Sequence, residues 1–574
     1  MNITINGLPY EVEEGLTILE AAHSVGIKIP TLCWLKEINE IGACRICLVE
    51  ANGRLVASCV IKAEEGMNIV TNSERVFRAR KNNLELLLSV HDKKCLSCEK
   101  SGKCEFQKLC NEMGVEESHY EGYRREYPID DSAPYLIRDN NKCVLCRRCV
   151  AVCQATQGIG AIGAINRGFA TYINTAFDRD LADVSCVGCG QCVRVCPTGA
   201  LMEKDSTADV WAALAQKDKH VVVQTAPAVR AALGEEFGLP IGTDVEGKMV
   251  AALRRLGFAR VFDTDFAADL TIMEEATELI ERVQNGGALP MITSCSPGWI
   301  KYCEHFYPEM IPHLSSCKSP QQMFGAVLKT YYAEKNNIDP KNIISVSVMP
   351  CTAKKFEIGR PDESASGYAD VDYSITTKEL ARMIRKAGID FVSLPDEQFD
   401  HPLGESTGAG VIFGATGGVM EAALRTAVET LTGEELPKLE FEEVRGTKGI
   451  KEASYKVGDL EVSVCVASGL ANAKKVMEAV KRGEKNYTFI EIMACPGGCV
   501  NGGGQPTQPS EVYNFNDLRA LRAQALYRND AAKAIRKSHE NPEIKKLYAE
   551  YFEKPGSHKA HEALHTTYVK RDRF

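Results

Sequence analysis

The sequence lacks an excess of positive charge, a long apolar run and the features of a secretion signal. Its formal net charge is -9, so a nucleic-acid partner is not indicated. No apolar run approaches the roughly 20 residues that a membrane-spanning helix needs. The segment from Met1 to Ile5 shows none of the basic, apolar and small-residue order of a signal peptide. We therefore expect a cytoplasmic protein in a reducing compartment, with no membrane span.

Cysteine, in contrast, is abundant. The chain has 23 cysteines in 574 residues, and most of them stand in close groups. Disulfides are rare in a reducing compartment, so clustered thiols indicate metal ligands instead. Several domains are expected at this length, and the cysteine groups mark where they lie.

Residues 1–78 are expected to form a small sheet-rich module. Apolar and polar residues alternate on both sides of Asn6-Gly7, a pair typical of a tight hairpin turn, and a helix is expected from Leu16 to Val25. Four thiolates suit a [2Fe–2S] cluster. Zinc is the alternative, and the neighbouring cysteine clusters make it the weaker one. The expected ligands are Cys33, Cys44, Cys47 and Cys59.

Residues 79–120 hold the next candidate metal site. The stretch from Arg75 to Val90 is expected to be a helix that delivers His91. A lone histidine is rarely a ligand, but this one begins a group of cysteines. One imidazole and three thiols make a four-ligand set that zinc would accept, and Cys110 is expected to be a spare thiol. The expected ligands are His91, Cys95, Cys98 and Cys104.

Residues 121–206 carry the most specific spacing in the chain. Two groups of four cysteines repeat the pattern of two-cluster bacterial ferredoxins, in which the fourth cysteine of each group binds the other cluster. A double zinc site or a chance match explains this crossed pattern poorly. One [4Fe–4S] cluster is therefore assigned to Cys143, Cys146, Cys149 and Cys196, and a second to Cys186, Cys189, Cys192 and Cys153.

From about residue 207 strand and helix patterns alternate, which is typical of a mainly parallel sheet covered by helices. Cysteine loops are expected at strand ends, where such sheets place ligands. The tail from about Asp517 to Tyr568 is expected to be charged amphipathic helix that wraps this region or meets a partner. The expected strands are His220–Gln224, Arg260–Asp263, Met291–Thr293 and Ile343–Met349, and the expected helices include Ala226–Phe237, Leu270–Val283 and Pro320–Glu334.

Two glycine-rich runs, Gly408–Gly410 and Gly414–Gly418, invite a nucleotide-binding interpretation. Neither run ends in the Gly-Lys-Ser/Thr of a phosphate-binding loop, and neither has a clean dinucleotide-fold context. We expect a glycine turn packed against a buried cofactor instead. NAD(P)H, if it is used, is therefore expected to bind another subunit.

Three distant segments offer thiols beside proline and glycine: Thr293–Trp299, Met349–Lys355 and Met493–Gly504. Thiolates are the soft ligands that iron–sulfur clusters take, and glycine lets a backbone approach a cluster closely. We expect these segments to meet at one buried iron–sulfur centre, around which the rest of the chain is organised.

Together with the upstream cysteine groups, these segments resemble the iron-only ([FeFe]) hydrogenases over essentially the whole chain, and most of all the catalytic subunit of multisubunit NAD(P)-linked forms. The resemblance implies a multidomain α/β fold and reversible oxidation of hydrogen. Its parts would be a β-grasp-like [2Fe–2S] ferredoxin domain, a [4Fe–4S] module with one histidine ligand, a two-[4Fe–4S] ferredoxin domain and an H-cluster domain, at residues 1–78, 79–120, 121–206 and 207–574.

The resemblance also supplies the cofactors. The H-cluster of this family is a [4Fe–4S] cubane bridged by one thiolate to a diiron unit that carries CO, cyanide and an azadithiolate. One [2Fe–2S] and three further [4Fe–4S] clusters would conduct its electrons. Hydrogen is split heterolytically, and the protein supplies orientation, electrostatics and a proton path.

The motifs assign ligands to this centre. Cys351 and Cys495 would bind the cubane, and Cys499 would bind it and bridge to the diiron unit. The family normally has two adjacent cysteines before a proline, of which the first relays protons and the second is a ligand. Here Cys295 falls on the relay position and Ser296 on the ligand position. Either the serine oxygen ligates, which would change the cubane potential, or a loop shift recruits Cys295 and the relay thiol is lost.

Further residues match the family's cofactor pocket. Lys354 matches a lysine placed against a cyanide, where a cation gives a charge-assisted hydrogen bond. Ala228 replaces a frequent serine, so one hydrogen bond to cyanide is expected to be missing. Ordinary core packing is the alternative for the two methionines. The expected pocket residues are Pro227, Ala228, Gln321, Met349, Lys354 and Met493.

A proton path is implied as well. Glu275, Glu278 and Arg282 stand at helical spacing and so share one face of a helix. An exposed acidic helix face would look the same by charge alone, but the match of the whole run from Thr271 to Glu278 favours a path. Its members would be Cys295, Glu275, Ser315, Glu278 and Arg282.

The resemblance implies partners: flavin- and NAD(P)-binding and small iron–sulfur subunits, ferredoxin, and maturation proteins for the diiron unit. Electron bifurcation, the direction in the cell and a stand-alone ferredoxin hydrogenase stay open. A respiratory-type subunit that only conducts electrons would leave Cys351, Cys495 and Cys499 unexplained. A non-enzymatic iron–sulfur assembly protein would not be expected to keep Lys354 together with Glu275.

Overall fold

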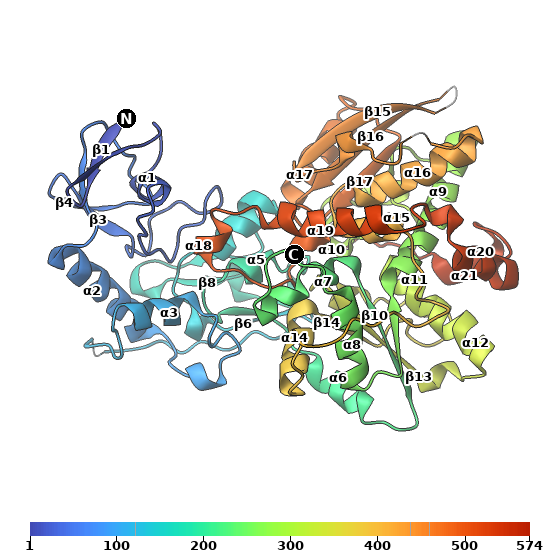
Figure 1. Ribbon diagram of the computed structural model, residues 1–574, viewed down its shortest axis with the longest axis horizontal. Coiled ribbons are helices and arrows are strands. Elements are labelled where there is room, and N and C mark those ends of the chain that lie inside the picture. The colour runs from blue at the N-terminus through green and yellow to red at the C-terminus, as the bar shows by residue number, and fades with distance from the viewer. Residues whose placement is uncertain (121, 437, 458–459, 574) are drawn as a thin grey trace.

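The computed structural model describes residues 1–120, 122–436, 438–457 and 460–573. Residues 121 and 574, at which two of the expected domains begin or end, lie outside this part. The N-terminal module lies at one end of the molecule, the large α/β region at the other, and the middle modules between them (Figure 1). Among the described residues, no helix has both the length and the apolar character that crossing a bilayer requires.

The N-terminal module is a five-stranded sheet in the order β2-β1-β5-β3-β4. The expected hairpin is confirmed, since Asn6 and Gly7 turn with φ of 52° and 83° between two antiparallel strands. Thr17 caps α1 through a capping box with Glu20. The elements are β1 (Asn2–Ile5), β2 (Leu8–Glu11), α1 (Ile18–Ser24), β3 (Leu48–Ala51), β4 (Arg54–Ala57) and β5 (Asn68–Val70).

The middle modules are held by short elements around the cysteine groups. The expected helix before His91 is confirmed as α2 (Glu74–Val90). The short helices α4 and α5 each follow a cysteine loop and begin in the same way. The residue before each has a left-handed backbone, Arg147 with φ 62° before α4 and Gly190 with φ 68° before α5. The other elements are α3 (Glu105–Glu112), β6 (Leu136–Arg138), α4 (Arg148–Ala151), β7 (Gly163–Ile165), β8 (Tyr172–Asn174), α5 (Gln191–Val195) and β9 (Leu201–Glu203).

The large region has two four-stranded sheets, where one mainly parallel sheet was expected. In the order β11-β10-β13-β14 every pairing is parallel. In the order β12-β17-β16-β15 the last pair is an antiparallel hairpin that the strand–helix alternation did not indicate. The strands are β10 (His220–Thr225), β11 (Arg260–Asp263), β12 (Met291–Ile292), β13 (Ile343–Met349), β14 (Tyr373–Thr376), β15 (Ile450–Val457), β16 (Leu460–Ser468) and β17 (Phe489–Met493).

Helices cover both sheets. The single helix expected at 226–237 is wrong, since α7 ends at Arg230 and a separate 3₁₀ turn spans Leu233–Phe237. A π-turn at Leu328–Tyr332 interrupts the helix expected from Pro320. The helices are α6 (Thr207–Leu214), α7 (Pro227–Arg230), α8 (Glu246–Leu256), α9 (Thr264–Asn285), α10 (Pro297–Phe306), α11 (Pro320–Val327), α12 (Ala333–Asn336), α13 (Lys354–Glu357), α14 (Thr377–Lys386), α15 (Gly408–Val411), α16 (Gly418–Thr432) and α17 (Leu470–Lys481).

The tail crosses the large region and then returns along its edge (Figure 1). It is a series of short helices where one helical stretch was expected. Side chains such as Arg522, Leu526 and Phe552 are fully buried and others such as Arg528 are exposed, so the tail packs on the large region through one face, as expected. After the last helix its backbone pairs with the segment before α11, where Thr566 N donates to Ser316 O at 2.8 Å. The helices are α18 (Ser510–Tyr513), α19 (Leu518–Ala532), α20 (Pro542–Leu547) and α21 (His558–Leu564).

Candidate active site and metal centres

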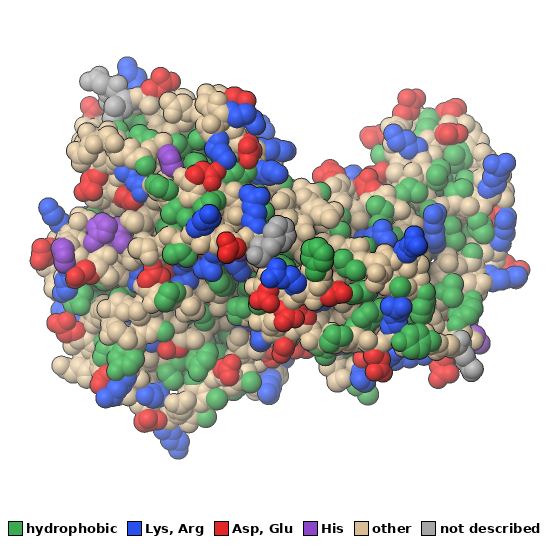
Figure 2. Space-filling view, turned by 180° about the vertical axis from the view of Figure 1, so that it is seen from behind, with side chains coloured by type: hydrophobic (Ala, Val, Ile, Leu, Met, Phe, Trp, Pro, Cys, Tyr) green, Lys and Arg blue, Asp and Glu red, His purple; other side chains and the backbone are tan. Residues whose placement is uncertain are grey.

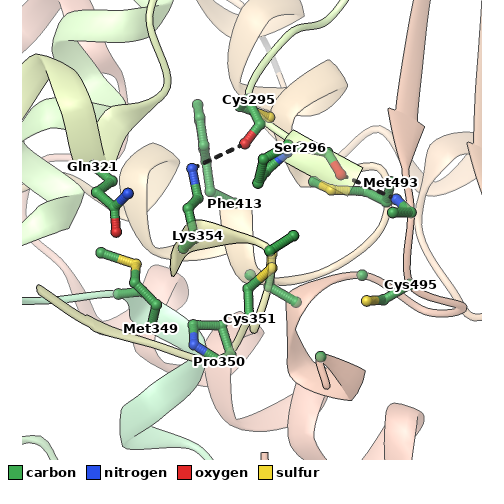
Figure 3. A pocket seen from close by; sticks show the side chains of 18 of the residues that line it. Cys295, Ser296, Gln321, Met349, Pro350, Cys351, Lys354, Phe413, Met493 and Cys495 are labelled. Carbon is green, nitrogen blue, oxygen red and sulfur yellow. Dashed lines mark hydrogen bonds between the residues drawn. The ribbon is translucent and has the colours of Figure 1, made fainter. Parts of the chain in front are cut away.

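The three cysteine segments meet at one buried cavity of about 80 Å³. Each lies just beyond the carboxyl end of a strand: Cys295 beyond β12, Cys351 beyond β13 and Cys495 beyond β17. Parallel strands bring their carboxyl ends to the same edge of a sheet, so the loops of the two sheets converge there. Figure 3 shows Cys295, Cys351 and Cys495, one from each loop, around the cavity.

The thiols of Cys351, Cys495 and Cys499 all line this cavity. Burial raises the pKa of each, and that of Cys495 reaches about 12. Buried thiols with raised pKa values stay protonated unless a cation offsets the charge of the thiolate. A set of soft sulfur donors in a mainly apolar cavity therefore fits an iron–sulfur cluster.

The glycine turn expected to pack against the cofactor does line the site. Gly414 is part of the cavity wall, and a Cβ added to Gly498 would lie 2.6 Å from Thr416 N. Gly498 also has φ of 94°, which residues with a side chain rarely adopt. The cysteine loop and the turn at Gly414–Gly418 are thus in backbone contact.

Cys295 and Ser296 both line the cavity, with different neighbours. Ser296 Oγ accepts a hydrogen bond from Ala494 N at 3.2 Å, beside Cys495 (Figure 3). Burial, and then the charge of Glu275, raise the pKa of the Cys295 thiol. Ser296 therefore lies toward the other cysteine loop, while Cys295 lies toward the acidic helix face.

Lys354 reaches the cavity from the first turn of α13. Its ammonium donates to Cys295 O at 3.2 Å, to Ser319 Oγ at 2.7 Å and to Glu357 Oε2 at 2.8 Å. Glu357 also accepts from Gln321 Nε2 at 2.9 Å. Sequence reasoning missed Glu357, although its spacing of three residues from Lys354 on a helix was a usable signal.

The other expected pocket residues divide into two groups. Ala228 is set back from the cavity: it is fully buried, and its Cβ would lie 3.2 Å from a Cβ added to Gly414. Its methyl group packs against Gly414, which does line the cavity. The cavity lining does include Pro227, Gln321, Met349 and Met493.

Three of the expected proton-path residues, Ser315, Glu278 and Arg282, are joined by hydrogen bonds. Glu278 accepts from Ser315 Oγ at 2.8 Å and from Arg282 Nη2 at 2.6 Å. The carboxylate of Glu275 is buried, and within the described part of the chain neither oxygen has a hydrogen-bond partner. Burial, with the charge of Glu278, raises the pKa of Glu275 to about 8. A carboxyl group with that pKa can both take up and release protons near neutral pH.

The four thiols of the N-terminal module converge. Hydrogen bonds with the thiols of Cys44 and Cys59 lower the pKa of Cys33, and Cys47 Sγ lies 3.2 Å from Cys59 Sγ. The positive φ of Arg45, 59°, folds the loop back between two of them. The structure therefore places all four expected [2Fe–2S] ligands together.

The second expected site is a cavity of about 420 Å³. Burial lowers the pKa of His91 to about 4, so its imidazole is neutral, the form that binds metals. Its Nδ1 is buried and has no hydrogen-bond partner among the described residues, as expected of a nitrogen that binds a metal. Cys110, expected to be spare, also lines this cavity. The expected ligands on its wall are His91, Cys95, Cys98 and Cys104.

One half of the expected crossed grouping in the third module shares a cavity. Cys153 lines one small cavity with Cys186, Cys189 and Cys192, although it comes from the other half of the repeat. The charge of Cys196 in turn acts on the pKa values of Cys143, Cys146 and Cys149. Cys189 also lines the main cavity, so the second group borders the principal site directly.

The modules touch through buried polar side chains that sequence reasoning missed. Asn39 Nδ2 donates to Cys33 O at 2.8 Å and to Cys146 O at 3.0 Å. The fully buried guanidinium of Arg148 donates to Cys33 O at 3.3 Å and pairs with Glu105 at 2.9 Å. These contacts join segments far apart in sequence, so no local pattern indicated them.

Family models match the chain in the order of its modules. A 2Fe-2S iron-sulfur cluster binding domain matches residues 1–74, the NADH-ubiquinone oxidoreductase-G iron-sulfur binding region matches 80–119, and a 4Fe-4S dicluster domain matches 142–200. The iron only hydrogenase large subunit, C-terminal domain, matches residues 219–503, and the iron hydrogenase small subunit matches 516–571.

Curated relatives match over the whole length. The chain is 52% identical to the NADP-reducing hydrogenase subunit HndD of Solidesulfovibrio fructosivorans, covering 100% of both proteins. It is 45% identical to iron hydrogenase 1 of Clostridium pasteurianum, covering 99% of this chain and 100% of that one. A solved structure of the apo [FeFe]-hydrogenase HydA1 from Chlamydomonas reinhardtii matches with 44% identity and a TM-score of 0.57, covering 64% of this chain and 100% of that one.

These matches agree with a cavity that gathers thiols from three loops beside a buried lysine. The conducting-subunit and assembly-protein alternatives are set aside, because hydrogenases match the full length at this identity. The chain belongs to the iron-only ([FeFe]) hydrogenases and is an enzyme of hydrogen metabolism.

Proposed function

We propose that this enzyme oxidises hydrogen reversibly at an H-cluster in the main cavity and passes the electrons through its accessory clusters to ferredoxin, to an NAD(P)-linked flavin subunit, or to both. The observation that carries the proposal is the meeting of Cys351, Cys495 and Cys499 with Lys354 at one cavity. The proposed domain boundaries are 1–78, 79–120, 121–206 and 207–574.

The cubane would be held by Cys351, Cys495, Cys499 and Ser296, with Cys499 as the bridge. Bound there, the cofactor supplies heterolytic cleavage of hydrogen. Lys354 would orient the diiron unit by turning the N–H that now makes a long bond to Cys295 O, while Glu357 and Ser319 hold the rest of the ammonium. Gln321, held by Glu357, would contact the same unit, and Met349, Met493 and Pro227 would exclude water from it.

Cys295, Glu275, Ser315 and Glu278 would move the proton away from the cavity, and Arg282 would hold Glu278. Cys295 can serve as this relay because Ser296, one residue further on, offers an oxygen toward the other cysteine loop. The raised pKa of Glu275 suits it to exchange protons near neutral pH.

Electrons would leave through Cys189, which belongs to the cluster of Cys186, Cys189, Cys192 and Cys153 and also borders the main cavity. The next cluster, of Cys143, Cys146, Cys149 and Cys196, would exchange electrons with both outer sites. One is the [2Fe–2S] site, through the contact of Asn39. The other is the His91 site, since a Cβ on Gly199 would lie 2.8 Å from Cys98 Sγ.

The full-length match to a subunit named for NADP reduction supports partner subunits that carry flavin and NAD(P), and a small iron–sulfur subunit. Maturation proteins would deliver the diiron unit. A stand-alone ferredoxin hydrogenase is the second candidate, and the full-length match to iron hydrogenase 1 supports it.

Infrared spectroscopy of the purified, matured chain tests the reaction centre. We expect CO and cyanide stretching bands, together with hydrogen uptake or evolution with a redox dye. A protein with complete iron–sulfur loading and maturation factors but neither bands nor activity would contradict the proposal. Co-purification of a flavin-bearing subunit would decide between the complex and the stand-alone enzyme.

A further inference from the structure

The proposed proton path has no titratable group at its outer end. Arg282 cannot be deprotonated in a protein, so it cannot take a proton from Glu278 and release it to water. Its guanidinium is instead occupied by Glu278 at 2.6 Å and by the carbonyl of Leu314 at 2.8 Å. Arg282 is therefore placed to fix the position and charge of Glu278. The Glu278 side chain is only 15% exposed, so a titratable neighbour nearer the surface would help it to exchange protons with solvent.

His565, which follows α21 in the tail, lies beside Glu278. A carboxylate oxygen of Glu278, the sulfur of Cys317 and a ring nitrogen of His565 all lie within 4.8 Å of one another. One water molecule or the Cys317 thiol can bridge that separation. The backbone bridge between Cys317 and His565 fixes this position. His565 Nδ1 lies 2.8 Å from Ser316 Oγ, and Ser316 N donates to Glu278 at 3.1 Å.

His561 continues this arrangement toward the surface. Its ring stacks on that of His565 with centroids 3.8 Å apart and planes at 17°. The side chain of His565 is only 6% exposed, whereas that of His561 is exposed. Figure 2 shows imidazole side chains together at the edge of the molecule where α21 lies.

We propose that protons exchange between Glu278 and solvent through His565 and His561, so that the tail contributes catalytic proton carriers and Arg282 is a positioning residue. During hydrogen oxidation the Glu278 carboxyl loses one proton and the His565 imidazole gains it. The His565 imidazolium passes a proton through water to the His561 imidazole, and the His561 imidazolium releases it to solvent. Hydrogen evolution runs the same transfer in reverse, and no electron moves in this step. Imidazole suits the role because it titrates near neutral pH.

Several charged and titratable groups surround His565 and His561. His565 Nε2 lies 3.2 Å from Glu274 Oε2, and Tyr548 donates to the same carboxylate. Burial lowers the pKa of His561, and the neighbouring His565 lowers it further. The charged and titratable groups facing the two imidazoles are Glu274, Glu278 and Glu281 of α9, Cys317 before α11, and Tyr548 of the tail.

The inference rests on the proton path proposed above, and the test separates the two. In matured His565→Gln enzyme we expect hydrogen oxidation to fall by about 100-fold, with unchanged CO and cyanide infrared bands and recovery of activity on adding imidazole. A structural role would not be rescued by imidazole. His558→Gln, whose side chain is 89% exposed on the same helix, is the matched control and should behave as wild type.

A second readout does not depend on turnover. The carboxylic acid stretch of Glu275 in the resting enzyme should exchange its proton slowly after transfer to deuterium oxide in His565→Gln, and quickly in wild type and His558→Gln. His561→Gln, changed at the surface, carries the same test if His565→Gln does not fold. The folded histidine variants could exchange protons and turn over as the wild type does, while Glu275→Gln is inactive. That result would overturn proton exchange through His565 and His561 but would leave the proposed path from Cys295 to Glu278 standing. Wild-type turnover in Glu275→Gln would overturn the path itself.

Discussion

Gly190 and Gly503 pack backbone against backbone where the third module meets the H-cluster domain. A Cβ added to Gly503 would lie 2.5 Å from Cys189 O and 2.6 Å from Gly190 Cα, and one added to Gly190 would lie 2.8 Å from Gly503 Cα. No real Cβ tolerates such distances, so only glycine at both positions permits the contact. It brings Cys189 to the wall of the main cavity, which would shorten the proposed route for an electron between the two sites.

Gly503→Ala tests this contact. The new methyl group meets only backbone atoms, so the modules must move apart, at a cost of about 1–3 kcal/mol of folding free energy. We expect a lower unfolding temperature and slower reduction of the accessory clusters by hydrogen, followed by visible absorbance. Gly163→Ala is the control, since nothing lies within 4 Å of its added Cβ. Equal reduction rates in both variants would rule out a role for the contact in electron transfer.

Glu275→Gln should leave the clusters intact and nearly abolish turnover. The amide keeps the shape of the buried side chain but cannot carry a proton, and general acid–base groups of this kind contribute about 10²- to 10⁴-fold. Dye-linked hydrogen evolution measures the loss, and infrared bands confirm loading of the cofactor. Glu281→Gln, exposed on the same helix, should retain activity. Wild-type evolution by fully loaded Glu275→Gln enzyme would remove Glu275 from the path.

Asn39→Leu should weaken electron exchange between the [2Fe–2S] site and the cluster of Cys146. One amide nitrogen serves the carbonyls of Cys33 and Cys146. Leucine leaves the carbonyl of Cys146 without that donor, at about 1–3 kcal/mol, whereas the carbonyl of Cys33 keeps its bond from Arg148. Freeze-quench paramagnetic resonance should show the [2Fe–2S] signal reduced out of step with the other clusters. Asn82→Leu, on an exposed position of α2, is the control. Reduction in step with the wild type would argue against Asn39 as the link.

Ser296→Cys should raise the midpoint potential of the cubane, because a softer, less basic thiolate would replace an alkoxide ligand. Spectroelectrochemical titration followed by infrared bands measures the shift. Cys295→Ser, in contrast, should keep the cubane and lose turnover with the relay thiol. If Cys295 is the ligand, the outcomes reverse: the potential responds to Cys295→Ser and stays unchanged in Ser296→Cys.

Local sequence patterns predicted many of the helices, strands and turns correctly. The hairpin at Asn6-Gly7, the helix ending at Val90 and the strand from Arg260 to Asp263 appear where expected, because turn chemistry and hydrophobic periodicity act over a few residues. The division into two sheets and the β15–β16 hairpin were missed, since both depend on which strands pair across long stretches of chain. The short 3₁₀ turn after Arg230 was missed for a related reason: tertiary contacts outweighed helix propensity.

The sequence by itself determined the chemistry: the spacing of its cysteines, the thiol-rich segments beside proline and glycine, and the helical spacing of Glu275, Glu278 and Arg282. The tertiary structure decided which groups meet. It set Ser296 toward Ala494, moved Ala228 behind Gly414, and laid His565 of the tail against Cys317. Spacing fixes contacts only within a few residues along a helix or loop, whereas these contacts arise from packing between segments that are distant in the chain.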